Sequence, residues 1–157
     1  MSSSLRKSDS EKRLVLKKAG KVRIAIAVSE WHPEVTGELY EGAEKTLLQH
    51  GIKRSHITRR NVPGSFELPL AAHLLFRKKY DAVICLGCVI KGETDHYDYI
   101  CSSVSKGIMD VSLAHSKPVA FGVLTTSSLE QALNRAGGKF GNKGVEAAES
   151  VLKMLAL

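Results

Sequence analysis

Apolar and polar residues alternate along the chain in two patterns. Nearly continuous apolar runs cover residues 22–28 and 82–90, which is typical of strands buried on both faces of a sheet. Between such runs, apolar residues recur every three to four positions, as on the buried side of an amphipathic helix. Strands that alternate with helices in this way predict a parallel sheet with helices on both faces. The fold class that we expect is therefore α/β, a three-layer α/β/α sandwich.

The other elements follow from the same patterns and from proline and glycine at their ends. We expect weaker strands over residues 55–60 and 118–124, which brings the sheet to four strands. Helices are predicted over five further segments, with Pro33 and Pro69 near two helix starts and Gly137 and Gly138 as a break. These segments are residues 33–50, 67–79, 100–111, 128–135 (after a cap at Ser127 or Ser128) and 145–155.

The 157 residues, 43% hydrophobic and 25% charged, have the size and composition of one globular domain. The net charge is +7, and an excess of six positive charges lies within residues 1–23. We therefore expect a basic, flexible tail over residues 1–20 and a single domain over residues 21–157. The domain lacks a basic face interleaved with aromatic residues, so no nucleic-acid partner is expected, and its cation runs are interpreted as solvated surface.

The cysteines and the apolar runs bear on the compartment. An odd count of three cysteines, a hydrophilic start and no signal peptide favour a reducing, cytoplasmic location. The longest apolar run has nine residues, whereas a helix needs about 20 to cross a bilayer, so no membrane span is expected. Cys85 and Cys88 have a redox or metal spacing, but residues three apart in a strand point to opposite faces. We expect two inert thiols and no metal site.

The candidate catalytic and binding residues are expected where the predicted parallel strands end, because open α/β sheets bind ligands beyond the carboxyl ends of their strands. The loop of residues 91–96 joins a strand to a helix there. Gly92 can adopt an unusual backbone angle, and free amide groups at the helix start can face an anion. An ordinary turn capped by Thr94 or Asp95 explains the same pattern. His96 beside such a site can exchange protons near neutral pH, whereas His73 is expected to be a core histidine.

Two further segments carry candidate binding residues. Phe66, Glu67 and Trp31 would place two aromatic surfaces and a carboxylate at the same sheet edge, which suits a planar heterocycle with hydroxyl groups. Each residue alone is also explained as a core or surface residue. Residues 134–144 combine four glycines with three cations, so that Arg135 and Lys139 or Lys143 could clamp an anion. A simple helix break with terminal charges fits that segment equally well.

Taken together, these segments resemble the 6,7-dimethyl-8-ribityllumazine synthase family of riboflavin biosynthesis. The resemblance extends from about residue 22 to the end of the chain, and three ordered motifs are far more specific than any one of them. The motifs are PGSFELP (residues 63–69), GCVIKGETDHYDY (87–99) and FGVLTT (121–126), the last continuing to GNKG (141–144).

The resemblance implies a flavodoxin-like four-stranded sheet and a transferase that needs neither cofactor nor metal. Its substrates would be 5-amino-6-(D-ribitylamino)uracil and 3,4-dihydroxy-2-butanone 4-phosphate. Their condensation gives 6,7-dimethyl-8-ribityllumazine, phosphate and water, which is the penultimate step of riboflavin biosynthesis. A non-catalytic flavin- or phosphate-binding module of flavodoxin type is the alternative, although the usual Ser/Thr-rich loop after the first strand is missing. A nucleic-acid-associated protein that acts through its tail is a third possibility.

The resemblance also implies residue roles. His96 would transfer protons, and Arg135 would hold the phosphate; these two are the expected catalytic residues. Trp31 would stack on the pyrimidine, and a neighbouring subunit would supply Phe121, Arg135 and Lys143. The remaining expected substrate-binding residues are Ser65, Phe66 and Glu67, then Val89, Ile90 and Lys91, and, near the phosphate, Gly92, Glu93 and Thr94.

Members of the family form homopentamers, and many assemble into an icosahedral shell, so we expect at least a pentamer, with riboflavin synthase as a candidate partner. The sequence departs from the usual family pattern at a few positions. Trp31 replaces Phe and keeps a stacking plane, His32 replaces Asn, and Lys91 replaces Arg. Gly138 and Phe140 stand where Thr and Ala are common.

Overall fold

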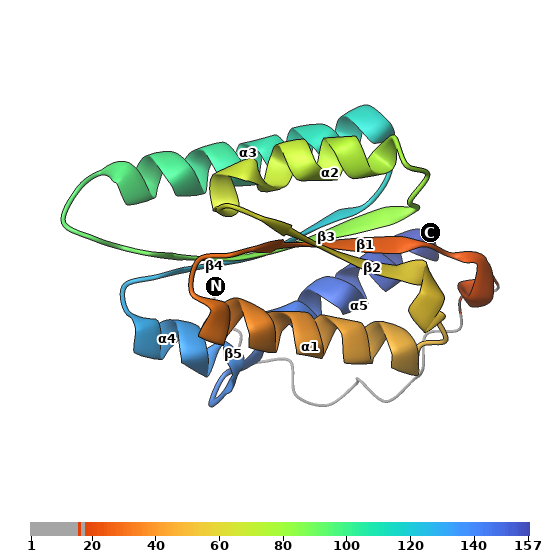
Figure 1. The fold of residues 1–157 in the computed structure, drawn as a ribbon, viewed down its shortest axis with the longest axis horizontal. Helices are drawn as coiled ribbons and strands as arrows, with labels where there is room; N and C mark the ends of the chain where they lie inside the picture. The colour runs from red at the N-terminus through yellow and green to blue at the C-terminus, as the bar shows by residue number, and fades with distance from the viewer. Residues whose placement is uncertain (1–15, 17) are drawn as a thin grey trace.

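A four-stranded parallel sheet forms the centre of the computed structural model, which describes residue 16 and residues 18–157 (Figure 1). Helices α2 and α3 cover one face of the sheet, and α1, α4 and α5 cover the other (Figure 1). The predicted three-layer α/β/α sandwich is therefore confirmed. In sheet order the strands are β2 (Ile57–Val62), β1 (Ile24–Ser29), β3 (Ala82–Ile90) and β4 (Val119–Thr126). The helices are α1 (Pro33–Gln49), α2 (Leu68–Phe76), α3 (His96–His115), α4 (Leu129–Asn134) and α5 (Lys143–Leu155).

The continuous apolar runs form the two central strands, as the pattern predicts. All six residues of β1 are buried, because this strand lies between β2 and β3 and is covered on both faces. Ile24 and Ile26 pack into the core beneath α1 and α5, whereas Ala25 and Ala27 pack into the core beneath α2 and α3. Burial on both faces favours apolar residues at every position before the terminal Ser29, which explains why the strand does not alternate.

The bounds of β2, β4 and α2 differ from the predictions, chiefly because short turns intervene or strand pairing continues. β2 begins at Ile57, since Arg54–His56 forms a 3-10 turn, and it extends to Val62, which pairs with Ser29. β4 continues through Thr126, which pairs with Ile90. α2 follows a 3-10 turn at Ser65–Glu67 and ends before the left-handed Lys79.

Between α4 and α5 the structure has a small hairpin that the sequence patterns did not predict. Its strands are β5 (Ala136–Gly138) and β6 (Gly141–Asn142), paired antiparallel. Gly137 and Gly141 have φ values of 107° and 84°, in the region that favours glycine. The glycine-rich segment thus forms a defined turn.

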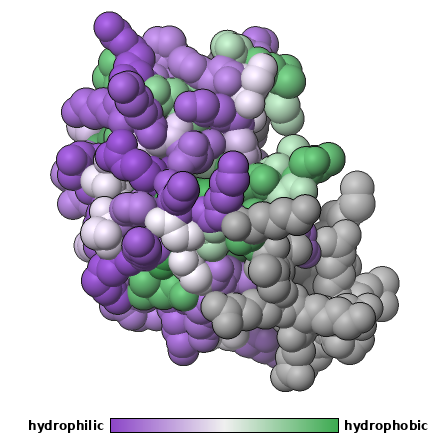
Figure 2. Space-filling model, turned by 90° about the vertical axis from the view of Figure 1, so that its right-hand side faces the viewer, coloured by the Kyte–Doolittle hydropathy of each residue, from purple (hydrophilic) through white to green (hydrophobic). Residues whose placement is uncertain are grey.

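The end of the molecule at which the strands begin is largely hydrophilic in its described part, with smaller apolar patches (Figure 2). The cation runs interpreted as surface are exposed, at residues 53–54, 59–60 and 77–79. Of the predicted tail, residues 1–15 and 17 lie outside the described part, and Leu16 and Ala19 pack against the core. No described helix combines the length and apolar character that a membrane span requires.

Candidate active site

The loops after β1 and β3 are tied to the ends of neighbouring strands, which gathers them at one edge of the sheet. The backbone N–H of Glu30 donates to Val62 O (2.9 Å), and that of Lys91 donates to Thr126 O (2.8 Å). Both loops lie at the left-hand edge in Figure 1, where the parallel strands end and α3 begins. These two loops therefore lie together beyond the carboxyl ends of the strands, where the candidate site was predicted.

The side chains of Trp31 and Glu67 both lie beside Gly64 at this edge. A Cβ atom at Gly64 would be 3.1 Å from Glu67 Oε2 and 3.5 Å from Trp31 Cδ1, so the carboxylate and the indole are close neighbours. The Trp31 side chain is 66% exposed and is available to a ligand. It borders an open depression of about 350 Å³ that is lined by Glu30, Trp31, His32, Pro33 and Pro63.

His32, one of the departures from the family pattern, precedes α1 in a left-handed conformation with φ 55° and ψ 61°. Asparagine and histidine are both enriched in that region of backbone space. The local backbone thus explains how His32 can stand where the family commonly has Asn.

The 3-10 turn before α2 presents one buried and one exposed candidate residue. Ser65 is buried against β3, and a Cβ atom at Gly87 would be only 2.5 Å from Ser65 Oγ, so this approach requires glycine. Among the described residues Ser65 Oγ has no hydrogen-bond partner. Phe66, by contrast, is 59% exposed, which leaves its ring free to cover a ligand.

The segment between β3 and α3 presents free amide groups beside His96. Within the described part of the chain, the backbone N–H groups of residues 92–97 donate to no other backbone group. His96 is the first residue of α3 and is exposed, as are Lys91, Gly92, Glu93 and Thr94, whereas Val89 and Ile90 end β3 half-buried. Free amides at the start of a 20-residue helix favour an anion.

The structure contradicts the unusual backbone angle considered for Gly92 and the side-chain cap of the alternative interpretation. Gly92 has no positive φ, so its backbone needs no glycine, and a Cβ atom there would meet no atom within 4 Å. Asp95 takes the N-cap position, but its side chain makes no capping hydrogen bond. The amide groups of the first turn are thus left without a side-chain cap.

Arg135, Lys143 and Phe121 are not brought to His96 within one chain. Arg135 follows α4 and Lys143 begins α5, in the layer on the opposite face of the sheet from α3 (Figure 1). Phe121 is 36% exposed and pairs with Cys85, five residues before β4 ends at Thr126. Among the described residues, no hydrogen bond or ion pair joins these three side chains to His96.

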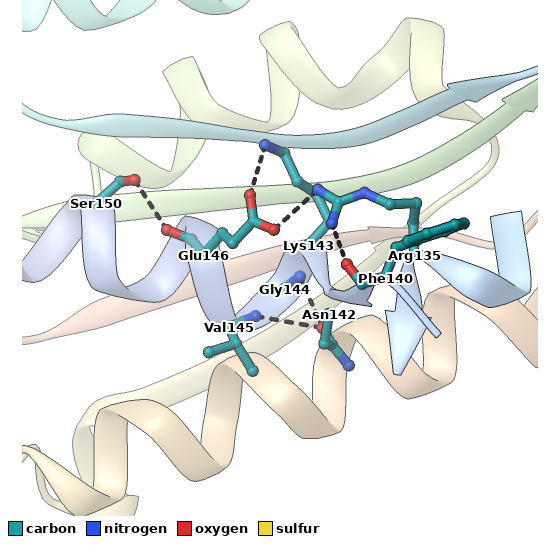
Figure 3. A network of polar contacts seen from close by, with 8 residues as sticks. All are labelled: Arg135, Phe140, Asn142, Lys143, Gly144, Val145, Glu146 and Ser150. Carbon is teal, nitrogen blue, oxygen red and sulfur yellow. Dashed lines mark hydrogen bonds and ion pairs between the residues drawn. The ribbon is translucent and has the colours of Figure 1, made fainter. Parts of the chain in front are cut away.

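Arg135 and Lys143 instead share Glu146, which the sequence reasoning missed (Figure 3). Arg135 Nη2 lies 2.8 Å from Glu146 Oε1, and Lys143 Nζ lies 3.1 Å from Glu146 Oε2. Partial burial favours the neutral carboxyl group, but the hydrogen bonds and charges of Lys143 and Arg135 outweigh it and lower the pKa of Glu146. An acidic residue three positions after Lys143 was the available sequence signal.

Cys85 and Cys88 lie on opposite faces of the sheet, as predicted. Cys85 packs beneath α2 and α3 and Cys88 beneath α1 and α5, on opposite faces of the sheet. Burial raises the pKa of Cys85 to about 12 and, together with the charge of Glu34, that of Cys88 to about 11. No three described His, Cys, Asp or Glu side chains are grouped so that they could hold a metal ion.

His73 was expected in the core and is exposed. Its Nδ1 lies 3.0 Å from Nε2 of His115, the last residue of α3. The buried positions of α2 are Leu68, Ala72, Leu75 and Phe76, and His73 lies outside that face. The short helix gave too few turns to fix which residues face the sheet.

The fold and this edge define a class of protein: an α/β enzyme-like domain that presents an indole, a carboxylate, free amides and a histidine beyond its parallel strands. Residues 21–157 match the sequence model of 6,7-dimethyl-8-ribityllumazine synthase, and the chain belongs to that family. It is 62% identical to a 6,7-dimethyl-8-ribityllumazine synthase of Cytophaga hutchinsonii over 132 residues, and these residues make up 83% of each chain. A protein of the same name from Parabacteroides distasonis is 48% identical over 138 residues, covering 87% of this chain and 86% of the relative.

Proposed function

We propose that residues 21–157 form a single catalytic domain that condenses 5-amino-6-(D-ribitylamino)uracil with 3,4-dihydroxy-2-butanone 4-phosphate. The products are 6,7-dimethyl-8-ribityllumazine, phosphate and water. The observation that carries this proposal is that exposed His96 and the free N–H groups of residues 92–97 lie at the same sheet edge as Trp31 and Glu67. A proton-transfer group, an anion site and an aromatic surface are what two such substrates need together.

The residues divide between the two substrates. Trp31 and Phe66 present exposed rings to the pyrimidine and its ribityl chain, and the Glu67 carboxylate accepts hydrogen bonds from hydroxyl groups. Ser65, Val89, Ile90 and Lys91 line the side of the site formed by β3 and the turn before α2. The amides around Gly92, Glu93 and Thr94 receive the phosphate.

The proposed reaction does not require the protein to form a covalent bond to either substrate. One substrate supplies the amine and the other the ketone, so the site holds them together and moves protons. His96 donates and accepts those protons, while the amide groups and Arg135 stabilise the departing phosphate.

The site is completed by a neighbouring subunit, which supplies Phe121, Arg135 and Lys143. Their separation from His96 within one chain supports this arrangement. Apolar side chains stand exposed on three helices, as expected of surfaces that other copies cover; they are Leu70, Leu74, Met109, Leu113, Leu129 and Leu133. The chain is thus proposed to form at least a pentamer, in the cytoplasm, with riboflavin synthase as a candidate partner. A monomer in light scattering at micromolar concentration would contradict this.

The test is to mix the purified protein with both substrates and follow the fluorescent lumazine, with the spontaneous reaction subtracted. We expect wild-type acceleration, and turnover about 10²- to 10⁴-fold slower for His96→Ala because general acid/base catalysis is removed. Binding of the pyrimidine should persist in the variant. A folded oligomer that binds flavin or phosphate but gives no acceleration would favour the non-catalytic binding module instead.

A further inference from the structure

Glu146 lies between Arg135, which the proposed function assigns to the phosphate, and Lys143, which the same neighbouring subunit supplies. One carboxylate oxygen contacts Arg135 Nη2 (2.8 Å) and the other contacts Lys143 Nζ (3.1 Å), as Figure 3 shows. We propose that Glu146 is a positioning residue, which holds Arg135 and Lys143 as one preorganised pair for the phosphate. This inference rests on the proposed function, because the pair is taken as part of that site.

The contacts restrict Arg135 from two directions. Nη1 donates to the backbone oxygen of Phe140 in the hairpin turn, while Nη2 donates to Glu146 on α5. A guanidinium group is planar, so two contacts to fixed acceptors determine the orientation of its whole plane. The Arg135 side chain is only 20% exposed, in keeping with one held position.

Glu146 is itself held by the start of α5. Asn142 Oδ1 accepts hydrogen bonds from the backbone N–H groups of Gly144 (2.8 Å) and Val145 (3.2 Å), which fixes the first turn of the helix. Asn142 Nδ2 donates to the backbone oxygen of Glu38 on α1 (2.9 Å). The carboxylate therefore stands on a helix end that is anchored to a neighbouring helix.

Arg135 and Lys143 can still bind an anion while both contact the Glu146 carboxylate. A guanidinium group has five N–H donors and an ammonium group three, so most donors remain after the observed contacts. Two positive charges against one negative charge also keep the cluster cationic. Glu146 thus orients the cations without neutralising them, and we expect its loss to weaken phosphate binding although it removes a negative charge.

The experiment uses Glu146→Gln, Glu146→Ala and Glu146→Asp, with Glu149→Gln on the same helix as the matched control. Inorganic phosphate is titrated into each protein by calorimetry, and steady-state kinetics are measured with both substrates. For Glu146→Gln and Glu146→Ala we expect a phosphate Kd and a KM for the phosphate substrate raised roughly 3- to 30-fold, which corresponds to about 0.7–2 kcal/mol, close to the net contribution of a single hydrogen bond. The KM for the pyrimidine should stay within about twofold, and Glu146→Asp should recover most of the loss.

A double-mutant cycle with Arg135→Lys separates positioning from general damage to the fold. Arg135→Lys should cost less in the Glu146→Gln background than in the wild type, because the guanidinium plane is no longer held there. Phosphate binding by Glu146→Gln that equals or exceeds the wild type would overturn the proposal, as would additive costs. If the wild type makes no lumazine while the phosphate Kd values shift as expected, the proposed function fails and the positioning role stands.

Discussion

The backbone of Gly144 lies directly on the backbone of Leu39, where α5 crosses α1. A Cβ atom at Gly144 would overlap the Leu39 carbonyl group, since even the carbonyl carbon would be only 2.7 Å away. In a close approach of two backbones neither side can yield by a rotamer change. The contact therefore requires glycine, and it sets the position of the helix that carries Lys143 and Glu146.

We accordingly expect Gly144→Ala to lower the free energy of unfolding by about 1–3 kcal/mol, the usual cost of overpacking. Gly37→Ala is the matched control, because a Cβ atom at that position in α1 meets nothing within 4 Å. There the exchange should be neutral or stabilising by roughly 0.5–1 kcal/mol through helix propensity. Urea denaturation of both variants measures the difference, and equal stabilities would show that α5 can shift away from α1 freely.

Trp31 is the single tryptophan of the chain and stands exposed at the proposed pyrimidine site. Binding of the ribitylaminouracil should therefore change the intrinsic tryptophan fluorescence directly. Trp31→Phe should keep a stacking plane and bind within a few-fold of wild type, whereas Trp31→Ala should lose about 0.5–1.5 kcal/mol of binding free energy. Calorimetry checks the two variants, which lack the fluorescent reporter, and equal affinity of Trp31→Ala and wild type would place the pyrimidine elsewhere.

The layers of the fold could be predicted because two of its strands are nearly continuous apolar runs, whereas the strand order was not predicted. A run such as residues 82–90 is compatible with burial on both faces, which in turn demands helices on both sides. The β5–β6 hairpin could not be predicted, since its two left-handed glycines also fit a plain helix break. His73 was misplaced because a nine-residue helix gives a weak periodicity.

The candidate site likewise has parts that could be predicted from the sequence and parts that could not. The loops that follow parallel strands lie at one edge of the sheet, so the position of Trp31, Glu67 and His96 at that edge could be predicted from the sequence. The approach of both Trp31 and Glu67 to Gly64 depends on side-chain positions that no sequence pattern encodes. Glu146 was missed because a surface acid early in a helix is ordinarily explained by the helix dipole alone.

The thiols offer an independent check of the core. Cys85 and Cys88 are buried, with pKa values raised to about 12 and about 11, while Cys101 is half-buried. Because the thiolate is the reactive form, no more than one thiol of the native protein, that of Cys101, should react with a disulfide reagent at pH 8. Cys101→Ser should remove that reaction, and all three native thiols should become reactive in denaturant. Rapid labelling of Cys88 in the folded protein would contradict the packing at the end of β3.

The ion pairs of Glu146 predict how its contribution to stability changes with pH. Its native pKa is lower than the ordinary value of 4.5, so the ionised form stabilises the folded state. That contribution is complete above pH 4.5 and is lost as the pH falls through the native pKa. The stability difference between wild type and Glu146→Gln should therefore be present at pH 7 and shrink toward pH 3. Glu149→Gln serves as the control, and a difference that grows on acidification would reverse the sign of the interaction.

The proposed lumazine-forming site is shared between two subunits, with His96 supplied by one and Arg135 by the next. The most direct test is to co-express His96→Ala and Arg135→Ala chains and to assay the mixed oligomers for lumazine formation. Each variant alone should be severely impaired, whereas random mixing should restore about one quarter of the sites, because each site draws the two residues from neighbouring chains. Mixed oligomers no more active than the separate variants, beside an active wild type, would contradict the shared site. A wild type that fails to accelerate the reaction would contradict the function itself.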